Sequence, residues 1–404
     1  MKICYLMPRM LPTPSGAVVG GSATNCVSLA LELKRQGAAI ELLASVSSDG
    51  VDRLADKPVA GIVNPLPTIG RGFIGKGLGT LHVLRRGLKD RLRETHFDVV
   101  HSHSGTYPYA VVPLMVDHKS CVRLHSLYCP LGAKGGAYSS WWEKSALSRL
   151  VLERLDRVIA ATENVRQSLE NAGVRPEKIE LVPMCVDAQR FHPMARPEPA
   201  KYFSGNGTCA RILFIGNASK EKGLLGLLAA VKLLKEKGVP VSFVAAIENQ
   251  CGIREYAAGY ELARTFVHRA KIESLVRFVG LVHSIERLYA ESDLVVIPWN
   301  TSRGPSDYPM VVLEAMAMGK CVVCTPVGGC PDLLAYGKAG MLTDGFSSQA
   351  IADAIEATVC NPTTRKKLEQ SALKRAEDFS LVNSARQLLR LYEHLLEGKE
   401  RHRV

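Results

Sequence analysis

The sequence lacks the features that mark several classes of protein. No stretch reaches the roughly 18 consecutive apolar residues that a membrane-spanning helix needs. No signature of a nucleic-acid-binding module occurs, and neither does the Gly-x-Gly-x-x-Gly fingerprint of dinucleotide-binding enzymes. We therefore expect no transmembrane segment, no nucleic-acid partner and no nicotinamide cofactor.

The N-terminus has no apolar core of the length that a secretory signal peptide needs. Residues 1–8 read instead as a first β-strand. The 11 cysteines are scattered through apolar segments, which is typical of reduced, buried thiols. Cys321 and Cys324 have the spacing of a metal or redox pair, but they fall on a predicted strand, where residues three apart point to opposite faces. These observations predict a cytoplasmic protein without a metal site at this pair.

Acidic residues are too few to balance the basic ones. The 404 residues include 51 Lys and Arg against 39 Asp and Glu, which gives a formal charge of +12. A basic excess favours an anionic partner. Nucleotide-sugar phosphates and an anionic bilayer both qualify.

Two parts of the chain alternate strand-like and helical segments. Apolar strand-like segments occupy residues 2–7, 39–44, 97–101, 121–125, 158–162 and 179–182, and then 211–215, 241–246, 276–279, 294–297 and 321–325. Helical spacing appears between them, as at residues 22–36 and 224–237. Buried strands that alternate with helices predict parallel sheets covered on both faces.

The periodicity fails between residues 187 and 209, where proline and glycine predict a linker. We therefore predict an α/β protein with two doubly wound, Rossmann-like domains at residues 1–193 and 205–382. A C-terminal helix at residues 383–404 is expected to pack on the first domain. Ligands of doubly wound domains bind at the carboxyl ends of the strands, so we expect the two domains to face each other across a ligand-binding cleft.

A loop and a short apolar helix at residues 305–319 have the features of an anion-binding site. Pro309 suits a first helical position, and Gly319 follows the expected end of the helix. Ser306 or Asp307 can cap the helix. The unpaired amides and the positive end of the helix would then face an anion such as a diphosphate.

Glu314 lies within the same apolar helix, where an unpaired carboxylate would be costly. A ribose diol would satisfy the carboxylate. The alternative is a core helix in which Glu314 is salt-bridged or lies at the surface.

Basic and glycine-rich loops offer further contacts to phosphate. A predicted strand ends at Gly216, and Lys220 and Lys222 precede a helix. A lysine there can neutralise a departing diphosphate, although a solvated loop lysine is the alternative. Gly20 and Gly21 open another helix, where backbone amides can approach a phosphate; a plain tight turn is the simpler interpretation.

Three histidines lie on predicted strands. His125 ends one strand, at the edge where a doubly wound domain presents its site. His101 and His103 lie on another strand and are weaker candidates. A lone histidine is more often structural than catalytic.

Together these segments resemble the family 4 glycosyltransferases. That family carries a glutamate, seven residues and a second glutamate. Glu314 matches the second, which binds the ribose hydroxyls of the donor. The position of the first glutamate, which contacts the donor sugar, holds Ser306, and the nearest carboxylate is Asp307.

The resemblance extends over nearly the whole chain in the family's order. Lys222 matches the lysine of the family's Gly-Arg-x4-Lys-Gly motif; Asn217 replaces the arginine, and Lys220 can supply the missing charge. His125 stands where the family has a histidine beside the donor sugar. Leu281 follows Gly280, after which the family's backbone holds the base.

The resemblance implies the GT-B fold and the retaining transfer of a sugar from a UDP- or GDP-sugar, with cell-envelope glycolipid or polysaccharide synthesis as the class of pathway. No Asp-x-Asp occurs, so we expect no metal ion and no cofactor, with amides and lysine stabilising the leaving diphosphate. The predicted catalytic residues are His125, Lys222, Ser306 and Asp307. The predicted donor-binding residues are Gly20, Gly21, Gly216, Asn217, Lys220, Leu281, Met310, Val311 and Glu314.

Two alternatives remain open. One is a GT-B phosphorylase or epimerase that uses the same site. The other is a degenerate GT-B protein that binds nucleotide or membrane without turnover, which the missing first glutamate and the missing arginine favour. The acceptor is not defined by the sequence.

The segment from Arg71 to Arg93 contains seven basic residues, one acidic residue and leucines at helical spacing. Such a helix can lie on an anionic bilayer, which would make the protein peripheral on the inner face of the membrane. The alternative is that its leucines pack on the first sheet and its arginines are solvated.

Overall fold

The computed structural model describes residues 1–401 except 13–17, 47–51, 53–60, 68–72, 118, 120, 133–144, 196, 198–199, 204–208, 248–253, 283 and 302–306. The chain divides into two compact units. The first consists of Met1–Cys185, Arg303–Asp307 and Leu381–Val404, and the second of Val186–Ser302 and Tyr308–Ser380.

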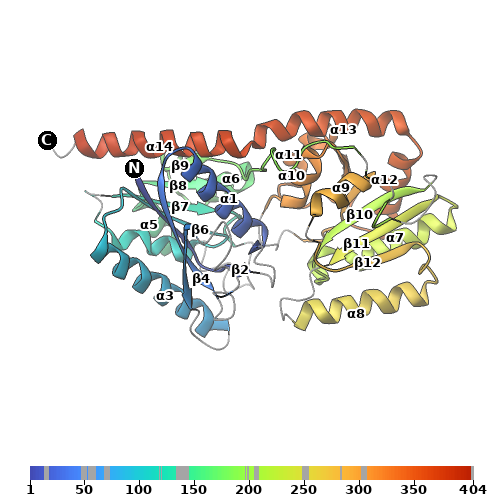
Figure 1. Cartoon of the computed structure of the whole chain (residues 1–404), viewed down its shortest axis with the longest axis horizontal. Coiled ribbons are helices and arrows are strands. Elements are labelled where there is room, and N and C mark those ends of the chain that lie inside the picture. The colour runs from blue at the N-terminus through green and yellow to red at the C-terminus, as the bar shows by residue number, and fades with distance from the viewer. Residues whose placement is uncertain are drawn as a thin grey trace. The chain divides into compact units, whose positions relative to one another are not determined.

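The first unit is built on a parallel sheet of seven strands (Figure 1). In chain order these are β1 (Lys2–Met7), β4 (Ala39–Val46), β5 (Val63–Pro67), β6 (Val99–Ser104), β7 (Val122–Leu127), β8 (Arg157–Ala160) and β9 (Ile179–Leu181). Their order across the sheet is β5-β4-β1-β6-β7-β8-β9. Ile3 of β1 pairs with Ile40 on one side and Val99 on the other. The short strands β2 (Leu11–Pro12) and β3 (Val18–Val19) form a separate antiparallel pair.

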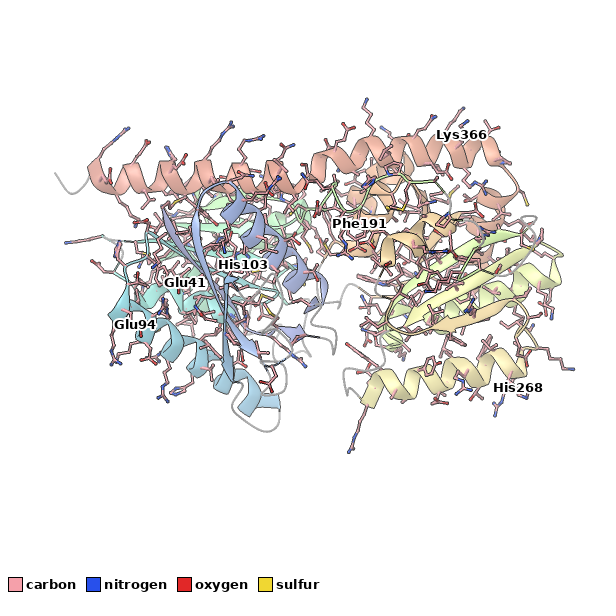
Figure 2. All side chains as sticks on the ribbon, viewed as in Figure 1. Glu41, Glu94, His103, Phe191, His268 and Lys366 are labelled. Carbon is pink, nitrogen blue, oxygen red and sulfur yellow. The ribbon has the colours of Figure 1, made fainter. Side chains whose placement is uncertain are left out.

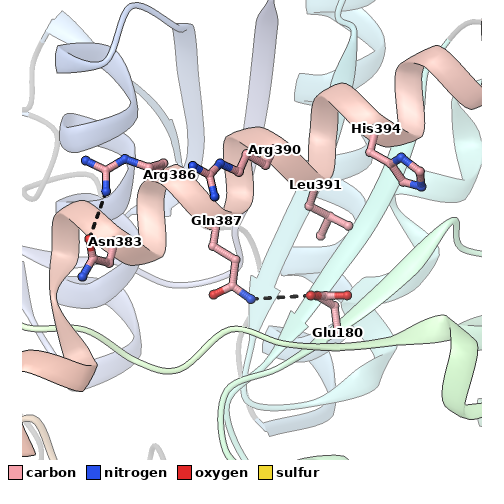
Figure 3. Close-up of a pocket in the computed structure, with 7 residues that line it drawn as sticks. All are labelled: Glu180, Asn383, Arg386, Gln387, Arg390, Leu391 and His394. Carbon is pink, nitrogen blue, oxygen red and sulfur yellow. Dashed lines mark hydrogen bonds between the residues drawn. The ribbon is translucent and has the colours of Figure 1, made fainter.

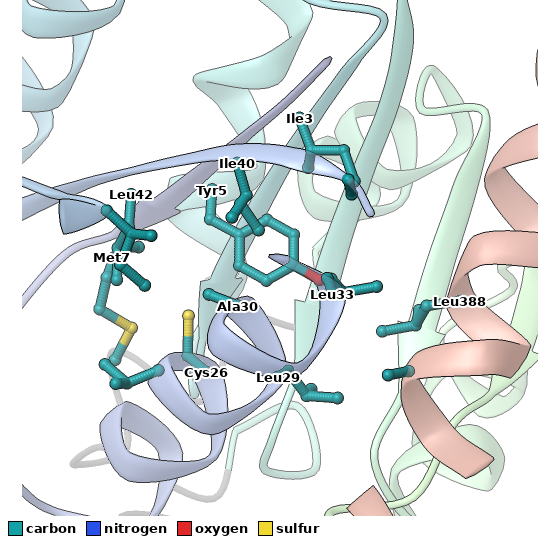
Figure 4. Close-up of a cluster of buried hydrophobic side chains, with 14 of the residues drawn as sticks. Ile3, Tyr5, Met7, Cys26, Leu29, Ala30, Leu33, Ile40, Leu42 and Leu388 are labelled. Atoms are coloured by element: carbon teal, nitrogen blue, oxygen red, sulfur yellow. The ribbon is translucent and has the colours of Figure 1, made fainter. Parts of the chain in front are cut away.

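Both faces of β1 are buried, as expected for the centre of a parallel sheet. Ile3, Tyr5 and Met7 point to the face that α1 (Gly21–Arg35) covers, and they share a core with Leu29 and Leu33 of that helix (Figure 4). The alternate residues of the strand point to the opposite face, which α3 (Phe73–Glu94) covers. The period of two along the strand therefore divides the core into two layers.

A third cluster of buried side chains lies under α5 (Ala146–Glu153) and α6 (Glu163–Asn171). Three short 3-10 helices complete this region: Tyr107–Val111, Pro113–Met115 and Pro176–Lys178. Thr162 caps α6, because its Oγ1 accepts a hydrogen bond from the amide of Val165 at 3.0 Å.

The helix α14 (Leu381–Arg401) also belongs to the first unit. Leu381, Ala385, Leu388 and Tyr392 recur every three or four residues and pack into the same core as α1. The Tyr392 hydroxyl lies 3.0 Å from the Tyr5 hydroxyl. Hydrogen bonding as well as apolar packing thus holds α14 on the unit.

The second unit has a parallel sheet of six strands. In chain order these are β10 (Ala210–Gly216), β11 (Val241–Ile247), β12 (Val276–Val279), β13 (Leu294–Ile297), β14 (Cys321–Cys324) and β15 (Met341–Leu342). Their order is β12-β11-β10-β13-β14-β15. Cys321 and Cys324 lie at the two ends of the buried strand β14, as the sequence predicted for a strand rather than a metal-binding pair.

Helices cover this second sheet as well. They are α7 (Leu224–Glu236), α8 (Arg254–Arg269), α9 (Ile285–Glu291), α10 (Met310–Ala317), α11 (Cys330–Leu333), α12 (Ser348–Val359) and α13 (Pro362–Ala376), with 3-10 turns at Lys220–Lys222, Ala335–Gly337 and Glu377–Phe379. Side chains of α7, α8 and α12 share one core with β10 and β11.

The prediction of a doubly wound α/β fold with parallel sheets is confirmed. The compact units meet in sequence at Cys185 and Val186, whereas the sequence placed the first boundary at residue 193. The residues expected to form a linker therefore begin within the second unit. Within the described part of the chain, no helix is both long enough and apolar enough to cross a membrane.

Replacing Tyr392 with Phe should lower the free energy of unfolding of the first unit by about 1–3 kcal/mol, because a buried polar group would lose its partner. The groups that would lose a hydrogen-bond partner are the Tyr5 hydroxyl and Nδ1 of His101, which lies 2.6 Å from the Tyr392 hydroxyl. Urea unfolding followed by circular dichroism measures the change. The matched control is Tyr336→Phe, because Tyr336 is 75% exposed. Equal midpoints for the two variants would contradict the structural role of the Tyr392 hydroxyl.

Candidate functional site

The order of strands in the second unit reverses between β10 and β13, and we call the edge of the sheet at the carboxyl ends of these two strands the crevice. These strands are neighbours, but the chain runs from β10 to β11 on one side and from β13 to β14 on the other. The loops that follow the two strands therefore diverge. Doubly wound sheets bind ligands at such a point of reversal.

Two loops meet at this crevice: residues 217–223 after β10, and residues 298–300 after β13. The side-chain amide of Asn300 donates to the carbonyl of Lys220 at 3.0 Å, and the backbone amide of Asn300 donates to the carbonyl of Glu221 at 3.2 Å. Gly223 has a φ of +69°, and a Cβ atom there would lie 1.7 Å from the carbonyl oxygen of Pro298. Only glycine allows the loops to approach so closely.

The structure distinguishes the two candidate lysines of the first loop. Lys222 is only 8% exposed, and its Nζ lies 3.2 Å from the centre of the Trp299 ring. The side chain of Lys220 is exposed to solvent. Asn217, at the position of the family's arginine, accepts a hydrogen bond from the amide of Ser219 at 3.0 Å and so shapes the turn. Gly216 ends β10, as predicted.

The helix α10 follows β13 and begins at the same edge of the sheet. Its first residues, Met310 and Val311, are partly exposed, and the first amides of an α-helix have no acceptor within the helix. Pro309 occupies the capping position rather than the first helical one, and no side chain of the described residues caps the helix. Gly319 follows the end of the helix with a φ of +65°, as its predicted place requires.

The carboxylate of Glu314 is held by a buried tyrosine. The Tyr289 hydroxyl donates to Oε2 of Glu314 at 2.6 Å, and the ring of Phe191 packs edge-on against Tyr289. Burial raises the pKa of Glu314 to about 7, against the opposing effect of the Tyr289 hydrogen bond. Oε1 bonds none of the described residues. The carboxylate is thus fixed through one oxygen, and the alternative of a salt-bridged glutamate does not hold among the described residues.

Leu281 lies just beyond β12, at the same edge of the sheet as Gly216. One strand, β11, lies between β12 and β10, so Leu281 is beside the crevice rather than in it. Leu281 is partly exposed. The predicted contact of its backbone with a base stays a prediction.

The first unit has its own point of reversal, between β1 and β6. The chain after β1 leads to Gly20, which has a φ of +106°, and then to Gly21 at the start of α1. Among the described residues, no atom lies within 4 Å of the position that a Cβ atom on Gly20 would take. The contact of Gly20 and Gly21 with a phosphate stays a prediction.

His125 is enclosed in β7 and does not end the strand, which continues to Leu127. The expectation that the strand ends at His125 is therefore wrong. Its Nδ1 lies 2.7 Å from Oγ of Ser102, while Nε2 has no partner among the described residues. Burial lowers the pKa of His125 to about 3, so the ring is neutral near pH 7.

His101 and His103 belong to a buried polar network on the opposite face of the sheet from His125. Figure 2 labels His103 in the first unit. His101 lies 2.6 Å from the Tyr392 hydroxyl through Nδ1 and 2.8 Å from Oγ of Ser126 through Nε2. His103 lies 2.8 Å from the Tyr128 hydroxyl. Burial lowers the pKa of both histidines, to about 3 for His103. These contacts assign both residues a structural role.

Asp307 belongs to the first unit and is 3% exposed. Thr162 donates from Oγ1 to its Oδ2 at 2.7 Å, and Asn164 donates from Nδ2 to its Oδ1 at 3.1 Å. The carboxylate thus lies at the N-terminus of α6, where a negative charge is favourable. The prediction that Asp307 caps α10 is wrong. Ser306, the other predicted cap and the position of the family's first glutamate, lies outside the described residues.

Two family models match this chain. One, described as "Glycosyl transferases group 1", matches residues 209–361, and the other, described as "Glycosyltransferase Family 4", matches residues 19–190. Between them they take in most of both units. The chain belongs to the family 4 glycosyltransferases.

Relatives and solved structures agree with this family and with the GT-B fold. A D-inositol 3-phosphate glycosyltransferase of Corynebacterium jeikeium is 26% identical over 95% of this chain and 94% of the relative, and one of Frankia alni is 28% identical over 74% and 75%. A sucrose-phosphate synthase of Thermosynechococcus elongatus superimposes with a TM-score of 0.78 at 17% identity, covering 98% of this chain and 99% of that one. HepE of Anabaena, solved with UDP, has a TM-score of 0.74 at 20% identity and covers 98% and 100%.

Two features of this glycosyltransferase were missed by sequence reasoning. Trp299 lies two residues after the end of the strand β13, so its place near a strand end was a usable signal. Tyr289 lies in α9, far in sequence from Glu314, and no local pattern pointed to it.

A groove of about 450 Å³ on the first unit of the glycosyltransferase shares no residue with the predicted site (Figure 3). It lies between β9 and α14 and is lined by Glu180, Asn383, Arg386, Gln387, Arg390, Leu391 and His394. Gln387 donates to the carbonyl of Leu181 at 3.0 Å and so ties the helix to this edge strand.

The basic segment of the glycosyltransferase forms α3, and its leucines are not available to a bilayer. Leu84 and Leu88 are fully buried against the first sheet, with Leu81 and Leu92 packed beside them. The side chains of residues 73–78 lie outside the described ones. Over residues 79–94 the leucines therefore pack on the first sheet, as the alternative interpretation predicted, while association with an anionic bilayer stays a prediction. Its exposed residues include Arg85, Arg86 and Lys89.

The stability of the first unit should fall as the pH is lowered from about 7.5 to about 5, whereas the raised pKa of Glu314 acts in the opposite sense on the second unit. The pKa values of His103 and His125 lie near 3 in the folded chain, below the ordinary 6.5. The unfolded chain therefore takes up protons below pH 6.5 that the folded chain does not. Each histidine thus removes about 2 kcal/mol of stability by pH 5.

Urea midpoints at the two pH values measure this loss. His125→Gln should show a smaller difference between them than the wild type, and the exposed His82→Gln should match the wild type. A wild-type stability that does not change between the two pH values would contradict the burial of neutral histidines.

Proposed function

We propose that this glycosyltransferase is retaining and moves a sugar from a UDP- or GDP-sugar to an acceptor without a metal ion. The observation that carries the proposal is the crevice at β10 and β13. There a basic side chain, Lys222, lies on a loop pinned by Asn300, and the open amides of α10 begin at the same edge of the sheet. An anion-binding edge of this kind suits a diphosphate.

Each group has a distinct role in this proposal. Lys222 and the amides of Met310 and Val311 bind the diphosphate and stabilise the charge that develops as it leaves the sugar. Glu314 accepts hydrogen bonds from the ribose hydroxyls through Oε1, while Tyr289 holds Oε2. The negative charge of the leaving group is met by fixed donors, which need no rearrangement during the reaction.

His125 and Asp307 are the predicted residues nearest the sugar in the family. Nε2 of His125 has no partner among the described residues, which supports a contact with a ligand, but the ring is fully buried. The carboxylate of Asp307 is engaged by Thr162 and Asn164. Both therefore stay predictions, and so do Gly20 and Gly21 as phosphate contacts and Lys220 as a second cation.

The comparisons suggest which substrates to test first. HepE was solved with UDP, which makes UDP the first nucleotide to test. The inositol-phosphate glycosyltransferases, with which this chain shares 26% identity in one case, suggest a hydroxylated anionic acceptor such as an inositol phosphate. The formal charge of +12 also favours an anionic acceptor. An envelope glycolipid or polysaccharide fits the same description.

Replacing Glu314 with Gln should weaken UDP or GDP binding by about 1–3 kcal/mol, because a charged hydrogen-bond acceptor for ribose is lost. Titration calorimetry measures the affinity. The control is Glu261→Gln, an exposed glutamate on α8. Release of nucleoside diphosphate from labelled donors, with and without EDTA, tests turnover and the absence of a metal ion.

Unchanged affinity in a folded Glu314→Gln variant would remove the ribose assignment. Binding without turnover of any donor would favour a degenerate binding protein. Phosphate-dependent release of a sugar phosphate would identify a phosphorylase, and conversion of the donor's own sugar would identify an epimerase.

We also infer a weak, salt-sensitive association with anionic membranes through the exposed face of α3. Arg85, Arg86 and Lys89 are exposed there, and each basic residue near an anionic surface contributes about 1 kcal/mol. The buried leucines leave electrostatics as the source of binding. This association would be peripheral and would place the protein on the inner face of the membrane.

Changing Arg85, Arg86 and Lys89 to glutamate should abolish cosedimentation with anionic vesicles at low salt, and high salt should release the wild type. The matched control reverses three exposed lysines of α13, Lys366, Lys367 and Lys374. A wild type that stays in solution at low salt, or equal effects of the two triple variants, would show that α3 binds no membrane.

A further inference from the structure

The crevice at β10 and β13 contains an aromatic side chain to which the proposed reaction assigns no role. We propose that Trp299 is a positioning residue of the donor site, which holds the Lys222 ammonium over its indole ring and presents it to the donor diphosphate. The inference rests on the proposed function of that site.

The contact between the two side chains is close and protected. Nζ of Lys222 lies 3.2 Å from the centre of the Trp299 ring. Trp299 is 7% exposed and Lys222 is 8% exposed. Cation–π attraction is strongest for tryptophan and increases when water is excluded. Both conditions are met here.

Hydrogen bonds hold the main chain on both sides of the Trp299 side chain. Oγ1 of Thr325, which directly follows β14, donates to the carbonyl oxygen of Trp299. The next residue, Asn300, donates to the carbonyls of Lys220 and Glu221 on the loop that carries Lys222. The ring and the lysine are therefore carried by two loops that are hydrogen-bonded to each other.

The aromatic nature of the group that contacts Lys222 matters for the binding of a diphosphate. An indole face attracts the ammonium through its quadrupole and leaves the positive charge in place. A flexible lysine side chain loses considerable rotamer entropy when it is ordered, and a contact made before the donor binds avoids that cost during binding. Trp299 thus prepares the cation without neutralising it.

A purely packing role for Trp299 would have different consequences. In that case its loss would lower stability and affect the site whether or not Lys222 is present. If Trp299 acts through Lys222, its loss should matter only while the lysine is present, and phenylalanine, which keeps an aromatic face, should restore part of the effect.

The test is a double-mutant cycle on the full chain, with UDP and GDP as probes and calorimetric affinity as the measurement. Trp299→Leu should weaken binding about tenfold, and Trp299→Phe should weaken it less. In a Lys222→Met background, Trp299→Leu should add less than about a twofold further loss. Thermal melting checks that each variant is folded, and Trp299→Phe keeps the test usable if the leucine variant is not.

A spectroscopic measurement gives an independent readout. The other two tryptophans of the chain, Trp141 and Trp142, are replaced by Phe, so that emission comes from Trp299. Saturating UDP should shift this emission, because the charge over the ring is compensated by the diphosphate. The shift should be absent in the Lys222→Met variant at a UDP concentration that calorimetry shows to be saturating.

Additive effects of the two substitutions, or an emission shift that survives without Lys222, would overturn this inference and leave the proposed function intact. Failure of the wild type to bind either nucleotide would overturn both. Coupling between Trp299 and Lys222, together with a lysine-dependent shift, would establish the positioning role.

Discussion

The parallel pairing of β10 with β13 is the constraint on which the candidate donor site depends. Ile212 and Leu213 pair with Leu294 and Val295, so the carboxyl ends of the two strands share one edge. The chain then leaves to opposite sides of the strand pair, and the two loops contact each other where they begin. Asn300 bonds the two loops together, and they bring Lys222 and Trp299, which are far apart in the sequence, into contact.

Much of the fold could be predicted because its signals are local. A strand such as β1 is apolar on both faces, which predicts a covered parallel sheet, and Gly319 has the positive φ that its place after α10 requires. The partner of Asp307 could not be predicted. Thr162 is 145 residues away, and no pattern near Asp307 distinguishes a helix cap from a bond to a remote helix.

Other parts of the site could not be predicted because the same sequence pattern occurs in two different structural settings. A leucine stripe beside basic residues is the same in a membrane-binding helix and in α3, which buries Leu84 and Leu88 in its own core. A histidine in a strand gives the same sequence pattern whether it faces a ligand or, like His101, bonds to a tyrosine of a helix. Lys222 could be placed because its spacing from Gly216 follows from a strand and a turn, whereas its contact with Trp299 depends on the order of strands.

The hydrogen bond between Tyr5 and Tyr392 joins residues 387 positions apart, with the whole second unit encoded between them. A ribosome therefore delivers the first strand of this unit long before the helix that closes over it. Until Tyr392 has been synthesised, the hydroxyl of Tyr5 and Nδ1 of His101 need another hydrogen-bond partner, such as water or a chaperone. Synthesis of the second unit thus sets the minimum time for which the first remains incomplete.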